Sequence, residues 1–354
     1  MTKTFEKGNV AIAKAAVSAG CHYYFGYPIT PQSDIPEYLS GVLPGIGGQF
    51  VQAESEVASI NMLLGAGSTG KRAMTSSSSP GISLKQEGIS YMAGSEIPGV
   101  IINIQRSGPG LGGISASQGD YFQSTRGGGH GDYRTIVLAP ATVQEMYDLT
   151  ILAFDLSDKY RIPAMVLADA MLGQMKEPLD EWKPELGKDY GHSEWILTGA
   201  KGRERRRVKS LYLGDGDLAE HNWRLAEKHK RISENETRAS VDIPEDAKLV
   251  VTAFGSAARI ARTAVDRARE EGHSVGILRP ITLWPFPAGE FVKVAAKGTP
   301  ILTVELNTGQ MVEDVEISVK GASKVSFCGY PPGYLPSPDE IYEKIIEILS
   351  GEEK

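Results

Sequence analysis

The sequence predicts an α/β protein built on a parallel sheet, and three observations support this prediction. Short apolar segments with strand character recur at 22–26, 49–52, 72–78, 100–105, 136–140 and 164–169. Segments with helical character lie between or beside them at 8–19, 54–67, 81–93 and 142–158, and a further helix is expected to start within 31–36. The strand segments are apolar on both faces, which is typical of parallel strands covered by helices on each side.

The alternation returns on a smaller scale after residue 246. A strand followed by a helix is predicted in 249–265, further strands at 274–281, 300–307 and 324–330, and a last helix at 338–349. Residues 176–245 are polar, carry the basic run KGRERRRVK (201–209) and predict a connector. The chain of 354 residues fits about two domains of the usual size. We therefore divide it into 1–175, the connector 176–245, and 246–354.

Composition excludes several classes of function. The net charge of -7 argues against a general affinity for nucleic acid. No apolar run is long enough to span a membrane, and the N-terminus lacks the apolar core of a signal peptide. Cys21 and Cys328 are the only cysteines and neither has a CxxC neighbour, so this chain is expected to hold no iron–sulfur cluster or zinc–cysteine site. Isolated thiols fit a reducing cytoplasm.

The first candidate for chemistry is Thr30, in the segment YPITP (27–31) directly after a predicted strand. Pro28 and Pro31 restrict the backbone on both sides of it. Threonine followed by proline is a good helix start, with Thr30 as N-cap and Pro31 at the first helical position. The loop at the carboxyl end of a parallel strand is also where ligands bind. The two interpretations are compatible.

The second candidate is the pair Glu54 and Glu56, where a predicted strand gives way to a helix. Acidic residues in a first helical turn are explained by the helix dipole alone. Two residues apart on a helix correspond to about 200° of rotation, so both side chains cannot face one site. At most one of them is expected to take part in chemistry.

The third candidate is Arg106, at the end of the apolar strand that opens NIQRSGPGLGG (103–113). A guanidinium there can bind a carboxylate with two hydrogen bonds, or form an ordinary ion pair. Gly108, Gly110 and Gly113 match the dinucleotide pattern GxGxxG, but Pro109 and the glycine run predict a loop instead of a helix. A nicotinamide dehydrogenase is therefore disfavoured.

A fourth segment, RGGGHGDYR (126–134), places three glycines before His130. Glycines let the backbone approach a ligand closely. A lone histidine is more often structural than catalytic, so His130 as an acid or base is the less favoured interpretation.

Seven segments taken together carry a resemblance. They are YPITP, AESEVASIN, SSSSPGISL, QRSGPGLGG, GGGHGDYR, LRPITLWPFP and VELNTGQMVEDV. They resemble, in family order and over nearly the whole chain, the α-type subunit of 2-oxoacid:ferredoxin oxidoreductases. The likeness is greatest to the branched-chain (3-methyl-2-oxobutanoate) member, and next to the 2-oxoglutarate member.

The resemblance implies a parallel-sheet domain that meets the pyrimidine side of thiamine diphosphate, followed by a smaller α/β domain like the C-terminal domain of transketolase. It implies a cytoplasmic enzyme of anaerobic metabolism that converts a 2-oxoacid and coenzyme A to acyl-CoA and CO2 and reduces ferredoxin. A non-catalytic assembly subunit is the alternative.

The resemblance also implies partners. Thiamine diphosphate would be shared with a β-type subunit that binds its diphosphate through Mg²⁺, other subunits would carry iron–sulfur clusters, and the core would be α2β2. LGDGDLAEHN (213–222) is similar to the GDG…N motif for that diphosphate. Asn222 follows too soon to return beside the aspartate, so we reject a metal site in this chain.

Residue roles follow from the same resemblance. Glu56 would hydrogen-bond the aminopyrimidine and favour the imino tautomer that removes the thiazolium proton; Glu56 is preferred to Glu54 on its spacing to SSSSPG. Thr30 would lie beside the 2-oxoacid and Arg106 would receive its carboxylate. Tyr27, Pro28 and Ile29 would also contact the cofactor. If the substrate were 2-oxoglutarate, Arg126 or Arg134 could supply a second cation.

Overall fold

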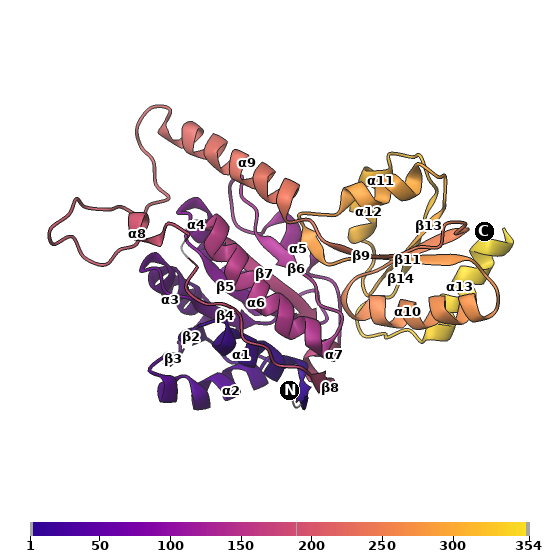
Figure 1. Ribbon diagram of the computed structural model, residues 1–354, viewed down its shortest axis with the longest axis horizontal. Helices are drawn as coiled ribbons and strands as arrows, with labels where there is room; N and C mark the ends of the chain where they lie inside the picture. The colour runs from indigo at the N-terminus through magenta and orange to yellow at the C-terminus, as the bar shows by residue number, and fades with distance from the viewer. Residues whose placement is uncertain (1–2, 189, 352–354) are drawn as a thin grey trace.

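A computed structural model describes residues 3–188 and 190–351. Its largest sheet has seven strands in the order β12–β6–β7–β5–β4–β2–β3 (Figure 1). Every pairing in this sheet is parallel except that of β12 with β6. The strands are β2 (Tyr23–Gly26), β3 (Gln49–Gln52), β4 (Ala73–Ser77), β5 (Gly99–Gln105), β6 (Ile136–Leu138), β7 (Pro163–Asp169) and β12 (Thr282–Trp284). The predicted parallel α/β class is confirmed.

Helices cover both faces of this sheet because alternate strand residues are apolar on each side. In β5, Val100, Ile102 and Ile104 belong to one core cluster, whereas Ile101 belongs to the other. One face is covered by α1 and α6, and the opposite face by α3 and α4 (Figure 1). The helices of this part are α1 (Gly8–Ser18), α2 (Asp34–Val42), α3 (Glu56–Ser68), α4 (Ser79–Gly94), α5 (Tyr121–Arg126), α6 (Val143–Tyr160) and α7 (Ala170–Gln174), with a 3-10 turn η1 (Pro44–Ile46).

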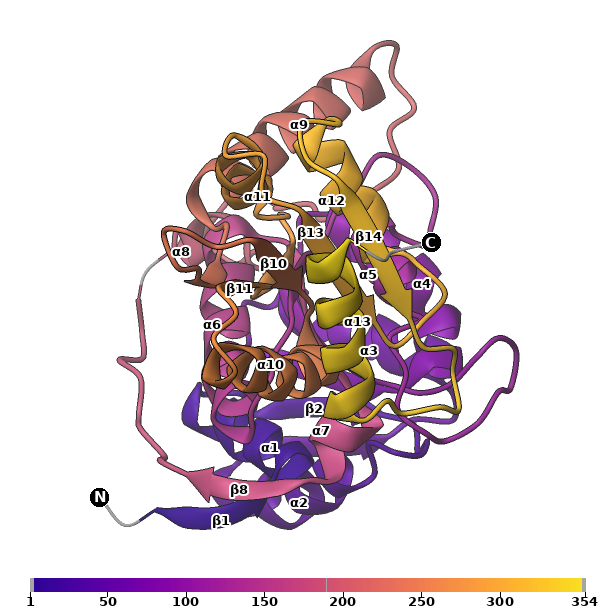
Figure 2. The same cartoon turned by 90° about the vertical axis from the view of Figure 1, so that its right-hand side faces the viewer.

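A second sheet of five strands forms a smaller lobe, drawn in orange and yellow in Figure 1. Its order is β14–β13–β10–β11–β9, parallel apart from the edge strand β9. Figure 2 shows α10 and α13 lying together on one face. The elements are β9 (Ala239–Asp242), β10 (Leu249–Thr252), β11 (Val275–Pro280), β13 (Ile301–Glu305), β14 (Val325–Gly329), α10 (Gly255–Glu270), α11 (Ala288–Ala295), α12 (Met311–Val319) and α13 (Pro338–Ser350).

The segment predicted as a connector contains more structure than its polarity indicated. Strand β8 (Lys176–Leu179) pairs antiparallel with β1 (Thr4–Lys7), and α8 (His192–Trp195) and α9 (Asp217–Asn235) follow. Figure 1 shows the chain looping away from the body before α9 returns across it. Helix α9 buries Leu225 and Ile232 but is otherwise mostly polar, which explains why the sequence did not predict it. Since β12 crosses from the later residues into the first sheet, the division at 175 and 245 stays a prediction.

Gln118 fixes the loop after β5 to the smaller lobe. Its buried amide donates to the carbonyl of Phe254 (2.7 Å) and accepts from the amide of Leu306 (3.0 Å), while Asn307 donates to the Gln118 carbonyl (2.9 Å). Because every one of these partners is buried, the loop that begins at Arg106 is held at its far end. No helix in the described part is long and apolar enough to cross a membrane.

Candidate active site

Four loops meet at the carboxyl edge of the seven-stranded sheet, following β2, β3, β4 and β5. Because these strands run parallel, their carboxyl ends share one edge. The chain passes outward from β2 to β3 and then returns across β2 to β4. Such a reversal of strand order opens a crevice between the loops, which is where ligands bind in open α/β sheets.

The loop after β2 holds Thr30 at the crevice. The Thr30 carbonyl accepts a hydrogen bond from Nη1 of Arg106 (2.9 Å), and its side chain is exposed. Gln32 is buried and its side-chain oxygen accepts from Ser76 Oγ (2.5 Å), and the Pro31 carbonyl accepts from Asn9 (2.8 Å). These bonds tie the loop to β4 and α1. Tyr27 and Pro28 are exposed beside Thr30, and Ile29 is half-buried.

The interpretation of Thr30 as a helix N-cap is wrong. Helix α2 begins at Asp34, and Ser33 occupies its N-cap position. The reason is tertiary: the anchored Gln32 and Pro31 hold the chain in a turn until Ser33, so the helix starts three residues later than the Thr–Pro pair predicted.

Arg106 is a buried cation without a carboxylate partner in the described residues. Only 8% of it is exposed, and its guanidinium donates to the main-chain carbonyls of Thr30 and Leu111 (3.3 Å). Its buried Nε has no hydrogen-bond partner there. The ordinary ion-pair interpretation is therefore wrong. A guanidinium held in this way has its positive charge available for the carboxylate of a ligand.

The structure separates the two candidate glutamates. Glu54 is exposed, whereas Glu56 is 6% exposed at the first position of α3, behind its N-cap Ser55. A Cβ added at Gly81 would lie 2.7 Å from Oε1 of Glu56, so this carboxylate faces the start of α4. No protein group in the described part of the chain donates a hydrogen bond to it. The residue is mostly buried, but its carboxylate oxygens stay accessible, so Glu56 can accept a hydrogen bond from a ligand.

Lys85, one turn further along α4, lies behind Glu56 and was missed by the sequence analysis. It is fully buried; its ammonium donates to the Glu56 carbonyl (3.3 Å) and to Ser59 Oγ. Burial lowers the pKa of Lys85 to about 8, against the opposing charge of Glu56. Burying the charged form therefore costs stability on the order of 3 kcal/mol at neutral pH, a cost relieved as the pH rises above about 8. Lys85 stands three residues after Ile82 and four before Ile89, which places it on the buried face of α4. This spacing in the sequence could have indicated that Lys85 is buried.

The residues around Glu56 fit one half of thiamine diphosphate. Buried polar atoms without a protein partner gather at the ends of β4 and β5: Ser77 Oγ, Ser78 Oγ, Asn103 Oδ1 and Arg106 Nε. With the free Glu56 carboxylate they offer donors and acceptors to a polar aromatic ring such as an aminopyrimidine. A magnesium diphosphate needs a cluster of oxygen ligands. Among residues 3–188 and 190–351, no group of three or more His, Cys, Asp or Glu could hold a metal.

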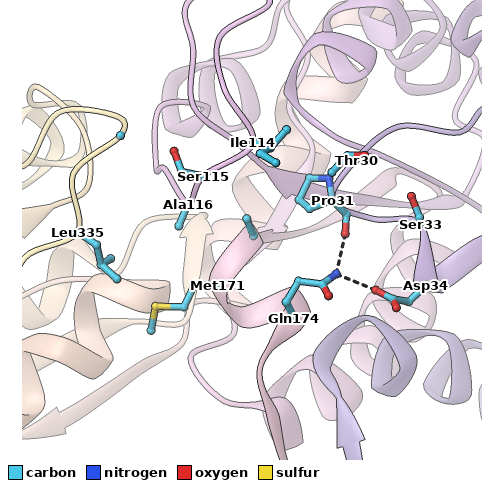
Figure 3. A pocket seen from close by; sticks show the side chains of 12 residues that line it. Thr30, Pro31, Ser33, Asp34, Ile114, Ser115, Ala116, Met171, Gln174 and Leu335 are labelled. Carbon is cyan, nitrogen blue, oxygen red and sulfur yellow. Dashed lines mark hydrogen bonds between the residues drawn. The ribbon is translucent and has the colours of Figure 1, made fainter.

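A cavity of about 630 Å³ adjoins Thr30, between this edge and the smaller lobe (Figure 3). Its walls are mainly apolar, with Ile114 and Ala116 on the loop after β5, Met171 on α7 and Leu335 from the smaller lobe. Asp34 is the only charged residue among the described residues that line it, and Gln174 donates to it (2.7 Å). Burial alone would raise the pKa of Asp34, but hydrogen bonds from Lys7, Asn9 and Gln174 lower it.

The glycine-rich segment 126–134 serves packing. A Cβ at Gly128 would lie 2.8 Å from Gln86, and one at Gly129 would lie 2.6 Å from the Gln86 carbonyl, so the glycines let this loop lie on α4. Close approach of this backbone to a ligand stays a prediction. The side chain of His130 is exposed. Arg126 pairs with Glu313 and Asp314, and neither Arg126 nor Arg134 lines the cavity beside Thr30.

Comparison with known families decides the relationship. Residues 14–229 match the thiamine diphosphate-binding family of pyruvate flavodoxin/ferredoxin oxidoreductases, and residues 247–341 match core domain II of pyruvate:ferredoxin oxidoreductase. The chain belongs to this family. The resemblance read from the sequence is confirmed, and with it the enzyme class: a subunit of a ferredoxin-dependent 2-oxoacid oxidoreductase.

Individual proteins of this family are similar to the chain over nearly its whole length. The chain is 48% identical to a ketoisovalerate oxidoreductase subunit of Methanothermobacter thermautotrophicus over 98% of both chains, and 36% identical to a 2-oxoglutarate synthase subunit of the same organism over 97% of this chain and 98% of that one. It superposes on a 2-oxoglutarate:ferredoxin oxidoreductase from Magnetococcus marinus with a TM-score of 0.86 and 25% identity, covering 98% of this chain and 65% of that chain. A split-gene transketolase, at 12% identity and a TM-score of 0.60 over 97% of this chain and 98% of that one, shares the fold.

Gly81→Ala tests the packing at Glu56. The new methyl would lie 2.1 Å from Ser77 Oγ as well as against Glu56. We therefore expect the free energy of unfolding, measured in urea, to fall by about 1–3 kcal/mol. Gly65→Ala, on α3 with nothing within 4 Å of the added Cβ, is the matched control and should stabilise the chain by about 0.5–1 kcal/mol. Equal stability of the two variants would contradict the close approach.

Proposed function

We propose that this chain forms the pyrimidine side of a thiamine diphosphate site that oxidises a 2-oxoacid. In the overall reaction the bond between the carboxylate carbon and the 2-oxo carbon breaks and CO2 leaves. The acyl group forms a thioester with coenzyme A, the thiol proton is released, and oxidised ferredoxin takes up the two electrons. The cofactor, when bound, supplies the nucleophilic carbon and the electron sink. The observation that carries the proposal is Glu56, a buried carboxylate without a protein donor in the described residues, at the crevice of the sheet.

Three side chains have defined tasks in this proposal. Glu56 holds a proton at the pyrimidine ring nitrogen, in a site where burial strengthens the interaction. Arg106 holds the carboxylate of the 2-oxoacid, because its charge has no internal partner in the described part of the chain. Thr30, whose carbonyl accepts from Arg106, presents its exposed hydroxyl beside that substrate. Tyr27, Pro28 and Ile29 form the adjoining wall.

The substrate class we propose is a branched aliphatic 2-oxoacid. The cavity beside Thr30 is lined by Ile114, Ala116, Met171 and Leu335, and no lysine or arginine of the described residues lines it. The distal carboxylate of 2-oxoglutarate would need a cation there, because an unpaired charge in an apolar cavity is costly. The similarity to a ketoisovalerate oxidoreductase subunit points the same way.

A β-type partner is proposed to cover this edge and to bring the diphosphate, Mg²⁺ and, with further subunits, the iron–sulfur clusters. Apolar side chains around the site are exposed in the single chain: Leu111 by 82% and Ile114 by 65%, with Val57 and Leu84 also exposed on α3 and α4. Exposed apolar groups around a crevice mark an interaction surface. An α2β2 core would bury an obligate interface of about 2,000 Å² or more. The two free cysteines fit a cytoplasmic enzyme.

Cofactor binding tests the half-site directly. We expect the isolated chain to bind thiamine diphosphate weakly, without dependence on Mg²⁺, and to bind it tightly and with Mg²⁺ only after its partner subunit is added. Isothermal titration calorimetry with and without the partner measures both. Tight, magnesium-dependent binding by the isolated chain would refute the proposal.

Glu56→Gln should lower turnover of the assembled enzyme by about 10²-fold or more, because an amide cannot exchange a proton with the ring nitrogen. Glu54→Gln is the matched control and should stay near wild type, since Glu54 is exposed. Steady-state ferredoxin reduction and light scattering separate loss of chemistry from loss of assembly. If Glu54→Gln loses turnover and Glu56→Gln retains it, Glu54 holds the pyrimidine ring. If both variants assemble and retain turnover, the chain is a non-catalytic assembly subunit, the alternative predicted from the sequence.

Arg106→Ala should raise KM for the 2-oxoacid more than KM for coenzyme A. Truncating one member of a buried charge pair costs about 2–5 kcal/mol, so the effect on kcat/KM for the 2-oxoacid should exceed about tenfold. Arg106→Lys should recover only part of it, because an ammonium lacks the planar fork. Equal effects on both substrates would assign Arg106 a structural role.

A further inference from the structure

The structure contains two buried lysines whose surroundings differ. Lys228, on α9, forms an ion pair with Glu96 and donates to the carbonyl of Arg161 (3.1 Å). Lys85, on α4, is fully buried and has no carboxylate within ion-pair distance in the described residues. Lys228 therefore has an ordinary structural explanation, and Lys85 does not.

Packing alone does not explain Lys85. Its neighbours on the buried face of α4 are Ile82 and Ile89, which belong to the apolar core. A methionine has similar length and would fill the same space without the desolvation of a charge, and well-packed apolar residues in place of buried ions are often neutral or stabilising. A group that costs stability at a site of chemistry is a candidate for function.

Within the described residues, the hydrogen bonds of the Lys85 ammonium all go to the first turn of α3. Its ammonium donates to the carbonyl of Glu56 (3.3 Å) and to the hydroxyl of Ser59, which itself donates to the same carbonyl (2.9 Å). The Glu56 carboxylate extends instead toward Gly81, on the ligand side. Glu56 is the titratable group whose charge acts on Lys85, and with a pKa of about 8 Lys85 is mostly protonated at neutral pH.

We propose that Lys85 is a positioning residue for Glu56: it anchors the main chain of Glu56 and supplies the buried positive charge that balances its carboxylate when the site is covered. This inference rests on the proposed role of Glu56. Arg106 donates to the loops after β2 and β5 and is proposed to bind the substrate carboxylate, whereas Lys85 lies on the core side of Glu56.

A double-mutant cycle on unfolding of the full chain tests the pairing without any activity measurement. Lys85→Met leaves the Glu56 carboxylate without its counter-charge. Glu56→Gln leaves the Lys85 ammonium without its counter-charge, and the double variant removes both charges. Each single change should increase the unfolding equilibrium constant relative to wild type. We expect the increase in the double variant to be at least about tenfold smaller than the product of the two single increases. Single effects that multiply to within about threefold of the double variant would overturn the inference.

In the assembled enzyme, Lys85→Met should lower kcat by about tenfold or more while KM for the 2-oxoacid changes by less than about twofold, since the substrate contacts remain. In the Glu56→Gln background the same change should cost nothing further. Lys228→Met is the matched control: it breaks the pair with Glu96, should lower the melting temperature and should leave kcat unchanged. A Lys85→Met enzyme with wild-type kcat overturns the inference.

The two levels of the proposal fail separately. If Glu56→Gln abolishes turnover but the cycle is additive, the proposed function stands and the role of Lys85 falls. If the cycle shows coupling but Glu56→Gln retains turnover, the buried pair is structural and both the proposed function and the positioning role fall.

Discussion

Parallel pairing of β2, β3, β4 and β5 is the constraint on which the site depends. It brings the ends of strands that are far apart in the sequence to one edge, so that Thr30, Glu56 and Arg106 converge although 76 residues separate the first from the last. Antiparallel pairing at any of these positions would send one loop to the opposite edge. The burial of both strand faces by helices keeps the sheet rigid, and only its edge is open to a ligand.

At that edge the protein buries charged side chains that lower its folding stability. Glu56, Lys85 and Arg106 are all buried, and none forms a salt bridge within the described residues. Elsewhere buried charged groups have protein partners: Lys228 pairs with Glu96, and the buried carboxylates of Asp169 and Glu305 accept main-chain N–H hydrogen bonds. Since the net stability of a domain is only about 5–15 kcal/mol, such desolvation is a substantial cost. For Glu56 and Arg106 the cost is understandable if the missing partners are a cofactor ring and a substrate carboxylate.

In the proposed function this edge supplies only the pyrimidine side of the cofactor site. Unpartnered polar atoms of Ser77, Ser78, Asn103 and Arg106 lie toward the ends of β4 and β5. Leu111 and Ile114 project from the loop that Gln118 anchors, and they are exposed. A partner chain that brings the diphosphate would bury these side chains and exclude water from Glu56 in one step, which links assembly to activation.

The sequence by itself determined the fold class, most of the strands and helices, and the family, because two-sided apolar strands and local motifs are encoded within short stretches. It also placed Thr30, Glu56 and Arg106 at strand ends. Only the tertiary structure decided what depends on distant partners: that Glu56 is buried and Glu54 exposed, that Ser33 instead of Thr30 caps α2, that the glycines at 128–129 pack on Gln86, and that Lys85 lies behind Glu56. Burial and counter-charge are properties of residues brought together by folding, and no local pattern specifies them.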